Sequence, residues 1–182
     1  MTNLALDSFK SQPGVWERLR TTWEARASMA AQYLSGEESV ADIGCGLMSL
    51  RKYLSAGVRY VPLDVVDRGG NIVVDLNHAP LPPVDTTAAS MLGVIEYLVD
   101  VDGVLSQLRS FRTVAISYNH WSLKDVTYRL LGKKRPQGWK HHMKRTDFER
   151  AIRRHGFFIE AQRRVRWGET LYRLRGPAFA TN

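Results

Sequence analysis

The residues of this sequence whose types and spacing could bind a ligand are a glycine turn and three aspartates. Asp42 stands two residues before the Gly44-x-Gly46 pair, and Asp64 and Asp75 end two later apolar runs. A Gly-x-Gly turn between a strand and a helix lets the backbone approach a nucleotide-like ligand, and an acidic residue about twenty positions further on can bind ribose hydroxyls. Asp64 stands twenty residues after Gly44. These residues predict a site for a nucleotide-like ligand.

Such a site needs several strands that end at one edge of a sheet. Short apolar runs predict strands, and apolar residues at helical spacing predict the helices between them. The expected strands are 39–43, 59–64, 72–75, 88–92, 113–117, 157–161 and 170–174, and the expected helices are 12–35, 49–54, 101–108 and 146–155. This alternation predicts an α/β, Rossmann-like doubly wound fold with a mostly parallel seven-stranded sheet. The last two strands predict a C-terminal antiparallel hairpin, and we expect a single domain over residues 1–182.

Three local features carry further expectations. Pro62 cannot donate a hydrogen bond to a neighbouring strand, so we expect a bulge or an interrupted pairing there. Thr146 and Glu149 match the Thr-x-x-Glu capping box and predict the start of the last helix. The segment 118–143 is too long for a routine connection, so we expect it to form a substrate site or a lid.

A dinucleotide is disfavoured as the ligand, because Ser49 stands where the Gly-x-Gly-x-x-Gly fingerprint needs its last glycine. An aspartate before the turn, one after the second strand and one after the third together resemble the class I S-adenosylmethionine-dependent methyltransferases. The resemblance covers nearly the whole chain. It extends to residues 93–97, Gly-Val-Ile-Glu-Tyr, which are similar to the family's Gly-Val-Leu-Glu-Tyr phrase, and to the closing antiparallel strands. It implies S-adenosylmethionine as the cofactor.

The resemblance also implies which residues bind that cofactor. Asp64 matches the family's ribose-binding acid, and residues 75–77 match the Asp-Leu-x segment that meets the adenine. This chain departs from the family at Met48, where many members have a third glycine. The full implied set of cofactor-binding residues is Asp42, Gly44, Cys45, Gly46, Asp64, Val65, Asp75, Leu76, Asn77, Gly93 and Glu96. We expect Cys45 to fill space beside the ligand rather than to act as a nucleophile, and we predict no metal site.

Methyl transfer requires the acceptor to be held at attack distance, and it requires a base only where a hydroxyl or protonated amine must lose a proton. Histidine suits this role because its pKa lies near neutrality. We therefore expect the catalytic residues among His120, His141 and His142, followed by Glu96 and Tyr118. The alternative is that His120 bonds a loop backbone, that the other two histidines lie on the surface, and that Glu96 lines or closes the cofactor site.

The charge of the chain is divided unevenly. Residues 1–100 carry 8 Lys and Arg against 12 Asp and Glu, whereas residues 101–182 carry 18 against 6. The basic second half predicts an anionic substrate, partner or surface, with a solvated basic face as the alternative. The Asn/Asp-Pro-Pro-Tyr motif of amino-methylating nucleic-acid enzymes is absent. We therefore expect a small-molecule or saccharide-type anionic acceptor, with RNA or another nucleic acid as the first alternative.

The second alternative comes from the tail of the chain. Residues 116–121, 130–133 and 146–149 are similar to phrases of the MetW-type proteins of bacterial methionine metabolism. That similarity implies a cofactor-binding partner protein with little activity of its own.

The cysteine content and the apolar runs bear on the compartment. The sequence has one cysteine, which excludes an internal disulfide, and no apolar stretch approaches the roughly 20 residues needed to span a bilayer. The N-terminus lacks a basic run followed by a long apolar core. We therefore expect a cytoplasmic protein without a transmembrane segment.

Overall fold

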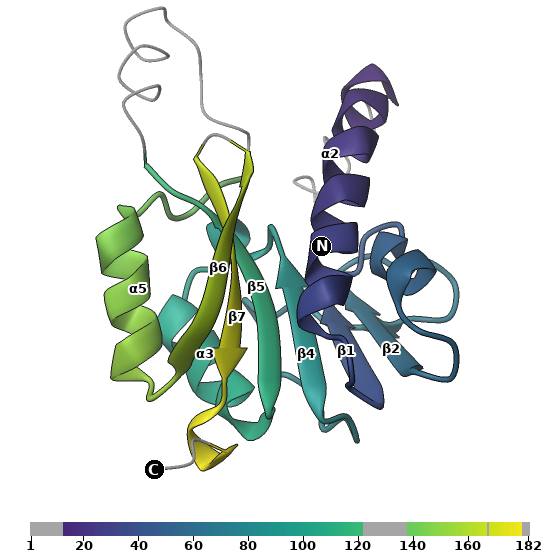
Figure 1. Cartoon of the computed structure of the whole chain (residues 1–182). Coiled ribbons are helices and arrows are strands. Elements are labelled where there is room, and N and C mark those ends of the chain that lie inside the picture. Colours follow the sequence, from purple (N-terminus) through teal and green to yellow (C-terminus); the bar gives the residue numbers. More distant parts are fainter. Residues whose placement is uncertain (1–12, 122–137, 167, 180–182) are drawn as a thin grey trace, which may run out of the picture.

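The computed structural model describes residues 13–121, 138–166 and 168–179. Seven strands form one sheet in the order β3-β2-β1-β4-β5-β7-β6 (Figure 1). The strands are β1 (Ser39–Ile43), β2 (Arg59–Asp64), β3 (Ile72–Val73), β4 (Ala88–Leu92), β5 (Thr113–Asn119), β6 (Phe158–Arg166) and β7 (Glu169–Arg175). The first five run parallel, and β7 lies antiparallel to both β5 and β6. The predicted α/β fold with a C-terminal antiparallel hairpin is confirmed.

Helices cover both faces of this sheet, as a doubly wound fold requires. Figure 1 shows α2 (Pro13–Tyr33) against one face, and α3 (Val101–Gln107) and α5 (Arg145–Arg154) against the other. Short 3-10 helices complete the chain, namely η1 (Ser49–Tyr53), η2 (Ile95–Tyr97), η3 (Leu108–Ser110) and η4 (Pro177–Phe179). None of the helices in the described ranges has the length and apolar character needed to cross a membrane.

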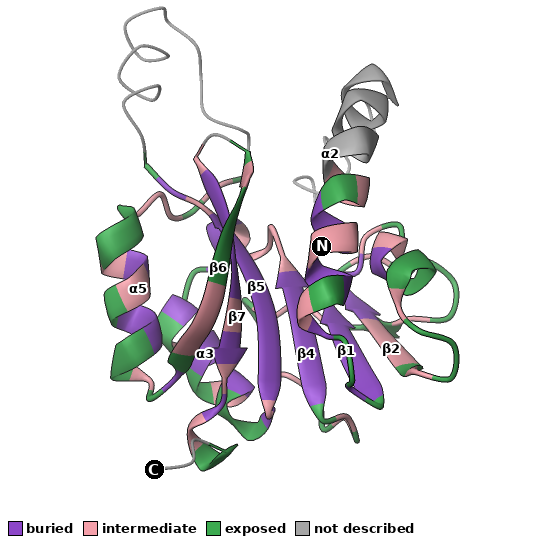
Figure 2. Ribbon diagram, in the orientation of Figure 1, coloured by how far each residue is buried: buried purple, intermediate pink, exposed green. Residues whose placement is uncertain are grey.

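The central strands β1, β4 and β5 are buried on both faces, which explains why they read as continuous apolar runs (Figure 2). Alternate residues of each strand point to opposite faces and build two cores. The larger core lies between the sheet and the helices α3 and α5. The smaller core packs α2 on the sheet through small side chains, including Ala27 and Ala30 of the helix with Ala88 and Ala115 of the strands. Small residues let the helix axis approach the sheet closely.

Two predicted elements are shorter than expected. The predicted helix 49–54 is the 3-10 helix η1, and the predicted third strand 72–75 is only two residues long. The C-terminal hairpin is longer than expected, because β6 continues to Arg166 and β7 begins already at Glu169. Glu169 pairs with Asn119, the last residue of β5, and Arg166 pairs with Glu169, so both residues stand at the edge where the glycine turn lies.

The bulge expected at Pro62 is absent, and that expectation was wrong. Pro62 pairs in register with Asp42, and no shift interrupts the β1–β2 ladder. The carbonyl of Leu63 accepts hydrogen bonds from the β1 side, whereas the carbonyl of Asp64 accepts the N–H of Val74 on the β3 side at 2.9 Å. Backbone groups of alternate residues point to the same neighbouring strand, so the backbone nitrogen of Pro62 also points to the β3 side. β3 begins only opposite Leu63. The missing N–H costs no strand bond because no strand is present at that level.

The capping box expected at Thr146 and Glu149 is also wrong. Helix α5 begins at Arg145, and its N-cap is Lys144, which makes no side-chain capping bond. Glu149 instead pairs with Arg145 one turn away, with 2.7 Å between Oε1 and Nε. The carboxylate is therefore used along the helix surface rather than at its start.

Candidate functional site

The glycine turn is anchored on the end of β2. The backbone N–H groups of Gly44 and Cys45 donate to the carbonyl of Leu63 at 2.8 and 2.9 Å. The N–H of Gly46 donates to Oδ2 of Asp64 at 2.8 Å. Gly44 has a φ of +74°, and a Cβ at this position would stand 2.3 Å from Cγ2 of Val94. Only glycine fits there, so the turn lies directly against the loop that follows β4.

Met48, where this chain departs from the family's usual glycine, keeps a glycine-like backbone. Its φ is 55° and its ψ is 33°, the left-handed conformation that most side chains avoid. It is the one non-glycine residue with positive φ in the part of the chain that the structure describes.

The carboxylate of Glu24 in α2 accepts hydrogen bonds from Lys52 at 2.6 Å and from Tyr53 at 2.7 Å, which fixes the helix to η1 just after the turn.

Two of the predicted aspartates are buried beside the turn. Asp42 is 3 % exposed and accepts a hydrogen bond from the hydroxyl of Tyr60 at 2.5 Å. Burial raises the pKa of Asp42 to about 6, although the Tyr60 bond acts in the opposite direction. Asp64 is 7 % exposed, and besides Gly46 its carboxylate accepts the N–H of Val66 at 2.9 Å. Each carboxylate oxygen of Asp64 therefore accepts one hydrogen bond from a backbone N–H of the described residues.

The third aspartate is more open and lies on the loop after β3. Asp75 accepts the N–H of Asn77 and contacts Nδ1 of His78, at 2.9 and 2.8 Å. The amide of Asn77 then reaches the loop after η2, where it accepts from the N–H of Val99 and donates to the carbonyl of Tyr97. The predicted adenine segment is therefore tied to the loop that follows β4.

Gly93 lies in that loop, and Glu96 lies in the 3-10 helix η2 that follows it. Gly93 has a φ of +70°, and a Cβ here would stand 2.4 Å from a guanidinium nitrogen of Arg26. Glu96 is 1 % exposed, and its Oε1 accepts both the N–H and the side-chain amide of Asn119, at 2.8 and 2.6 Å. Burial raises the pKa of Glu96 above its usual range. The second oxygen, Oε2, is buried and has no hydrogen-bond partner among the described residues.

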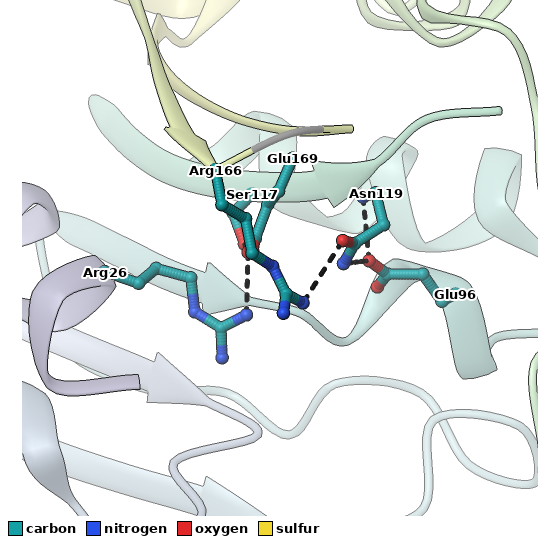
Figure 3. A network of polar contacts seen from close by, with 6 residues as sticks. All are labelled: Arg26, Glu96, Ser117, Asn119, Arg166 and Glu169. Atoms are coloured by element: carbon teal, nitrogen blue, oxygen red, sulfur yellow. Dashed lines mark hydrogen bonds and ion pairs between the residues drawn. The ribbon is translucent and has the colours of Figure 1, made fainter. Parts of the chain in front are cut away.

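Sequence reasoning missed a buried ionic cluster beside this loop. Figure 3 shows Arg26 of α2 and Arg166 of β6 approaching the same carboxylate, Glu169, which is fully buried. Both ion pairs are 2.8 Å long, and the hydroxyl of Ser117 lies 3.1 Å from Oε1 of Glu169. Burial alone would raise the pKa of Glu169, but the two guanidinium groups lower it below its usual value. Arg166 also reaches Oδ1 of Asn119 at 3.4 Å, which joins this cluster to Glu96.

Arg166 and Glu169 are three residues apart, but Arg26 and Ser117 come from distant parts of the chain, and no spacing in the sequence connects them to Glu169. The available signal was weak: Glu169 is an acidic residue at the start of an otherwise apolar and basic strand. A carboxylate at a fully buried position requires a cationic partner; Arg166 is three residues away, but Arg26 is 143 residues away in sequence.

His120 lies on the other face of the sheet from this cluster. Its Nε2 lies 3.1 Å from the hydroxyl of Tyr172, and its ring packs edge-on against Tyr118. Phe148 stacks on Tyr118 in the same group, which belongs to the core under α5. Burial, helped by the charge of Arg145, lowers the pKa of His120 to about 4. This placement favours a packing role for His120 and Tyr118, and their catalytic role stays a prediction.

The other two predicted histidines lie on segment 138–143, which forms neither a helix nor a strand. Nε2 of His141 lies 2.9 Å from the carbonyl of Val99, and the ring of His142 packs edge-on against Trp139. The N–H of Lys140 donates to the carbonyl of Glu96 at 2.6 Å, which holds the segment against the loop after β4. The remainder of the predicted substrate or lid segment, 122–137, lies outside the described residues and includes the basic run 133–135.

The remaining predicted cofactor residues also lie at this edge. Cys45 is 7 % exposed, and burial raises the pKa of its thiol to about 12, so the thiolate is disfavoured. Val65 is 40 % exposed beside Asp64, whereas Leu76 packs partly against the larger core.

No protein-family model and no curated protein matches the sequence. Solved structures do match the fold. The chain is similar to magnesium protoporphyrin IX methyltransferase from Synechocystis, with bound S-adenosylhomocysteine, at 16% identity and a TM-score of 0.67 over 91% of this chain and 88% of that one. It is similar to the 1,6-didemethyltoxoflavin N1-methyltransferase of Burkholderia thailandensis at 15% identity and a TM-score of 0.68, over 95% and 87% of the two chains. The chain has the fold of the class I S-adenosylmethionine-dependent methyltransferases.

A third similar structure is a complex between the Trm112 methyltransferase activator of Haloferax volcanii and a methyltransferase. It matches at 14% identity and a TM-score of 0.68, over 91% of this chain and 94% of that one.

Within the methyltransferase fold, all of the residues expected to bind the cofactor lie at or directly after β1, β2, β3 or β4. They therefore share the C-terminal edge of the parallel strands, the edge at which ligands bind in open α/β sheets.

Proposed function

We propose that this chain is an S-adenosylmethionine-dependent methyltransferase. The observation that carries the proposal is the glycine turn, in which Gly44 leaves no room for a side chain and Gly46 is held by Asp64. The buried carboxylates of Asp42 and Asp64 lie at the turn and fit a ligand that carries a sulfonium and an ammonium group.

The residues around the turn fit the parts of S-adenosylmethionine in separate ways. A carboxylate can accept about four hydrogen bonds, and Asp64 accepts two from the described backbone, so it retains capacity for the two ribose hydroxyls. Asp75, Leu76 and Asn77 would meet the adenine, and Gly93 and Glu96 would border the methionine part. The cofactor supplies a methyl group activated by the positively charged sulfur. Two of the similar methyltransferases hold its product, S-adenosylhomocysteine, which supports this assignment.

We propose a small-molecule or saccharide-type anionic acceptor. Arg166 supports this assignment, because its side chain is 43 % exposed beside the end of β5 while one edge of its guanidinium is held by Glu169. A partly exposed guanidinium can bind a carboxylate or phosphate in a fixed orientation. The excess of basic residues after position 100 supports nucleic acid as the alternative acceptor. The similarity to a methyltransferase solved with an activator supports a protein partner as a further possibility.

The cofactor assignment is tested by calorimetry with S-adenosylmethionine and S-adenosylhomocysteine. We expect the wild type to bind both and Asp64→Ala to bind at least about 10-fold more weakly, because hydrogen bonds to a charged group contribute about 1.5–3 kcal/mol. Asp67→Ala is the matched control, since Asp67 is exposed three residues further along the same loop. Circular dichroism must show that each variant is folded. A folded wild type that binds neither compound would refute the proposal.

The acceptor class is tested with methyl-labelled S-adenosylmethionine. Phenols, amines, hydroxy acids and sugar phosphates form one panel, and transfer RNA forms the second. Turnover of an anionic small molecule supports the proposal, whereas salt-dependent retention and labelling of RNA would favour the nucleic-acid alternative.

A further inference from the structure

The two carboxylate oxygens of Glu96 have different surroundings. Oε1 accepts two hydrogen bonds from Asn119, one from its backbone and one from its side chain. Oε2 is equally buried, yet it accepts none from the residues that the structure describes. The two hydrogen bonds from Asn119 give Oε1 a structural role. Oε2 has no such role, because a buried acceptor without a donor destabilises the fold.

The position of Glu96 is fixed by its own backbone. Its carbonyl accepts the N–H groups of Lys140 and His141, at 2.6 and 3.2 Å. It stands three residues after Gly93, and Gly93 follows β4 at the edge that holds the glycine turn. Figure 3 shows its carboxyl group beside Asn119, with Arg166 on the far side of that amide. A group held this firmly at the end of β4 can direct an oxygen at a ligand bound over the same edge.

The charged groups near Glu96 come from three other elements. Glu169 of β7 raises the pKa of Glu96, while burial is the largest cause of that rise. Arg166 of β6 and Arg26 of α2 are both engaged by Glu169. Asn119 of β5 is neutral, and Lys140 and His141 approach Glu96 through backbone N–H groups. A carboxyl group whose pKa is raised above its ordinary value is a stronger base than an ordinary surface glutamate.

We propose that Glu96 is the catalytic base of the proposed methyl transfer, with Oε2 taking the proton of the acceptor's hydroxyl or amine. This inference rests on the proposed function. The acceptor's oxygen or nitrogen forms a bond to the methyl carbon while the carbon–sulfur bond breaks and sulfur keeps the electron pair. The acceptor's proton moves to Oε2 of Glu96 and is later released to water. The acceptors implied are phenols, alcohols or amines that must lose a proton.

The first test is Glu96→Gln, which keeps an acceptor oxygen for Asn119 and replaces Oε2 with an amide that cannot take a proton. We expect S-adenosylhomocysteine to bind within about 2-fold of the wild-type affinity. We expect kcat to fall by about 100-fold or more, with KM little changed, because general base catalysis contributes about 10²–10⁴-fold. The acid limb of the wild-type pH profile should be lost. Glu38→Gln is the control, since Glu38 is exposed at the opposite end of β1 and should leave turnover unchanged.

The second test does not depend on turnover. A raised pKa in the folded state means that protonation of Glu96 stabilises the fold and ionisation weakens it. Wild-type stability should therefore fall relative to Glu96→Gln as the pH rises from the ordinary glutamate pKa through the raised folded value. In urea unfolding at pH 8, Glu96→Gln should match or exceed the wild type, and this difference should vanish in acid.

The outcomes separate this inference from the proposed function. A wild type that binds S-adenosylhomocysteine but methylates nothing in the panel would overturn the proposed activity, and this inference with it. Full turnover by Glu96→Gln would overturn this inference alone. A variant that is less stable than the wild type at pH 8 would also overturn it, because Glu96 would then serve the fold as an ion.

Discussion

The glycine turn allows a matched comparison between two residues of the same loop. Gly44 and Gly46 both have positive φ, at +74° and +52°. A Cβ on Gly44 would stand 2.3 Å from Cγ2 of Val94, whereas a Cβ on Gly46 would have nothing within 4 Å. Alanine at either position therefore adds the strain of a left-handed side chain, but only alanine at position 44 adds a steric clash.

The structure gives a magnitude for each substitution. The left-handed conformation costs an alanine about 1 kcal/mol, so Gly46→Ala should lower the free energy of unfolding by about that amount. Overpacking costs a further 1–3 kcal/mol or so, and the stiff β-branched Val94 cannot easily rotate away. Gly44→Ala should therefore cost about 2–4 kcal/mol. Adding Val94→Ala should remove the overpacking cost, giving a favourable coupling of about 1–3 kcal/mol.

Urea unfolding followed by circular dichroism measures these free energies for the wild type, the single variants and the double variant. S-adenosylhomocysteine binding by calorimetry then reports whether the relieved turn still accepts the ligand. Equal losses for Gly44→Ala and Gly46→Ala, or a double variant no better than the sum of its parts, would refute the steric argument. In that case the loop after β4 does not press on the turn in solution.

Two further predictions concern stability. Met48→Gly should raise the free energy of unfolding by about 1 kcal/mol in urea, because glycine adopts the φ of 55° without strain; a loss would show that packing of the Met48 side chain outweighs that strain. His120→Gln should remove a pH dependence: the folded pKa of about 4 lies below the ordinary 6.5, so the unfolded chain takes the proton first. Wild-type stability should fall relative to the variant between pH 6.5 and 4, by about 3 kcal/mol in all, and parallel urea curves across that range would contradict the burial of His120.

Much of the fold could be predicted from local sequence. The bounds of β1, β2 and β4 agree with the predicted ranges 39–43, 59–64 and 88–92. These strands are short apolar runs that end at a turn or a carboxylate, and their burial on one or both faces keeps that pattern clear. The glycine turn and its aspartates were recognisable for the same reason, since neighbours in sequence supply both the conformation and the carboxylates.

The errors arise where a residue's role depends on where a neighbouring element begins or on which side chains it packs against. Pro62 is tolerated because β3 starts late, and the proline itself carries no information about where its neighbour begins. Thr146 and Glu149 match a local motif, but Glu149 lies within reach of Arg145 and the hydroxyl of Tyr172, and the helix starts without the cap.

Sequence alone therefore determined the order of elements, the glycine turn and the edge of the sheet at which a ligand would bind. Only the tertiary structure decided which polar side chains lie together at that edge. Ser117 and Asn119 point to the α2 side of β5 while His120 points to the α5 side, and alternation along a strand cannot tell which side is functional. The ionic cluster of Arg26, Arg166 and Glu169 exists because β7 pairs with β5 and α2 crosses above them. Such contacts follow from the packing of whole elements, which residue spacing along the chain does not record.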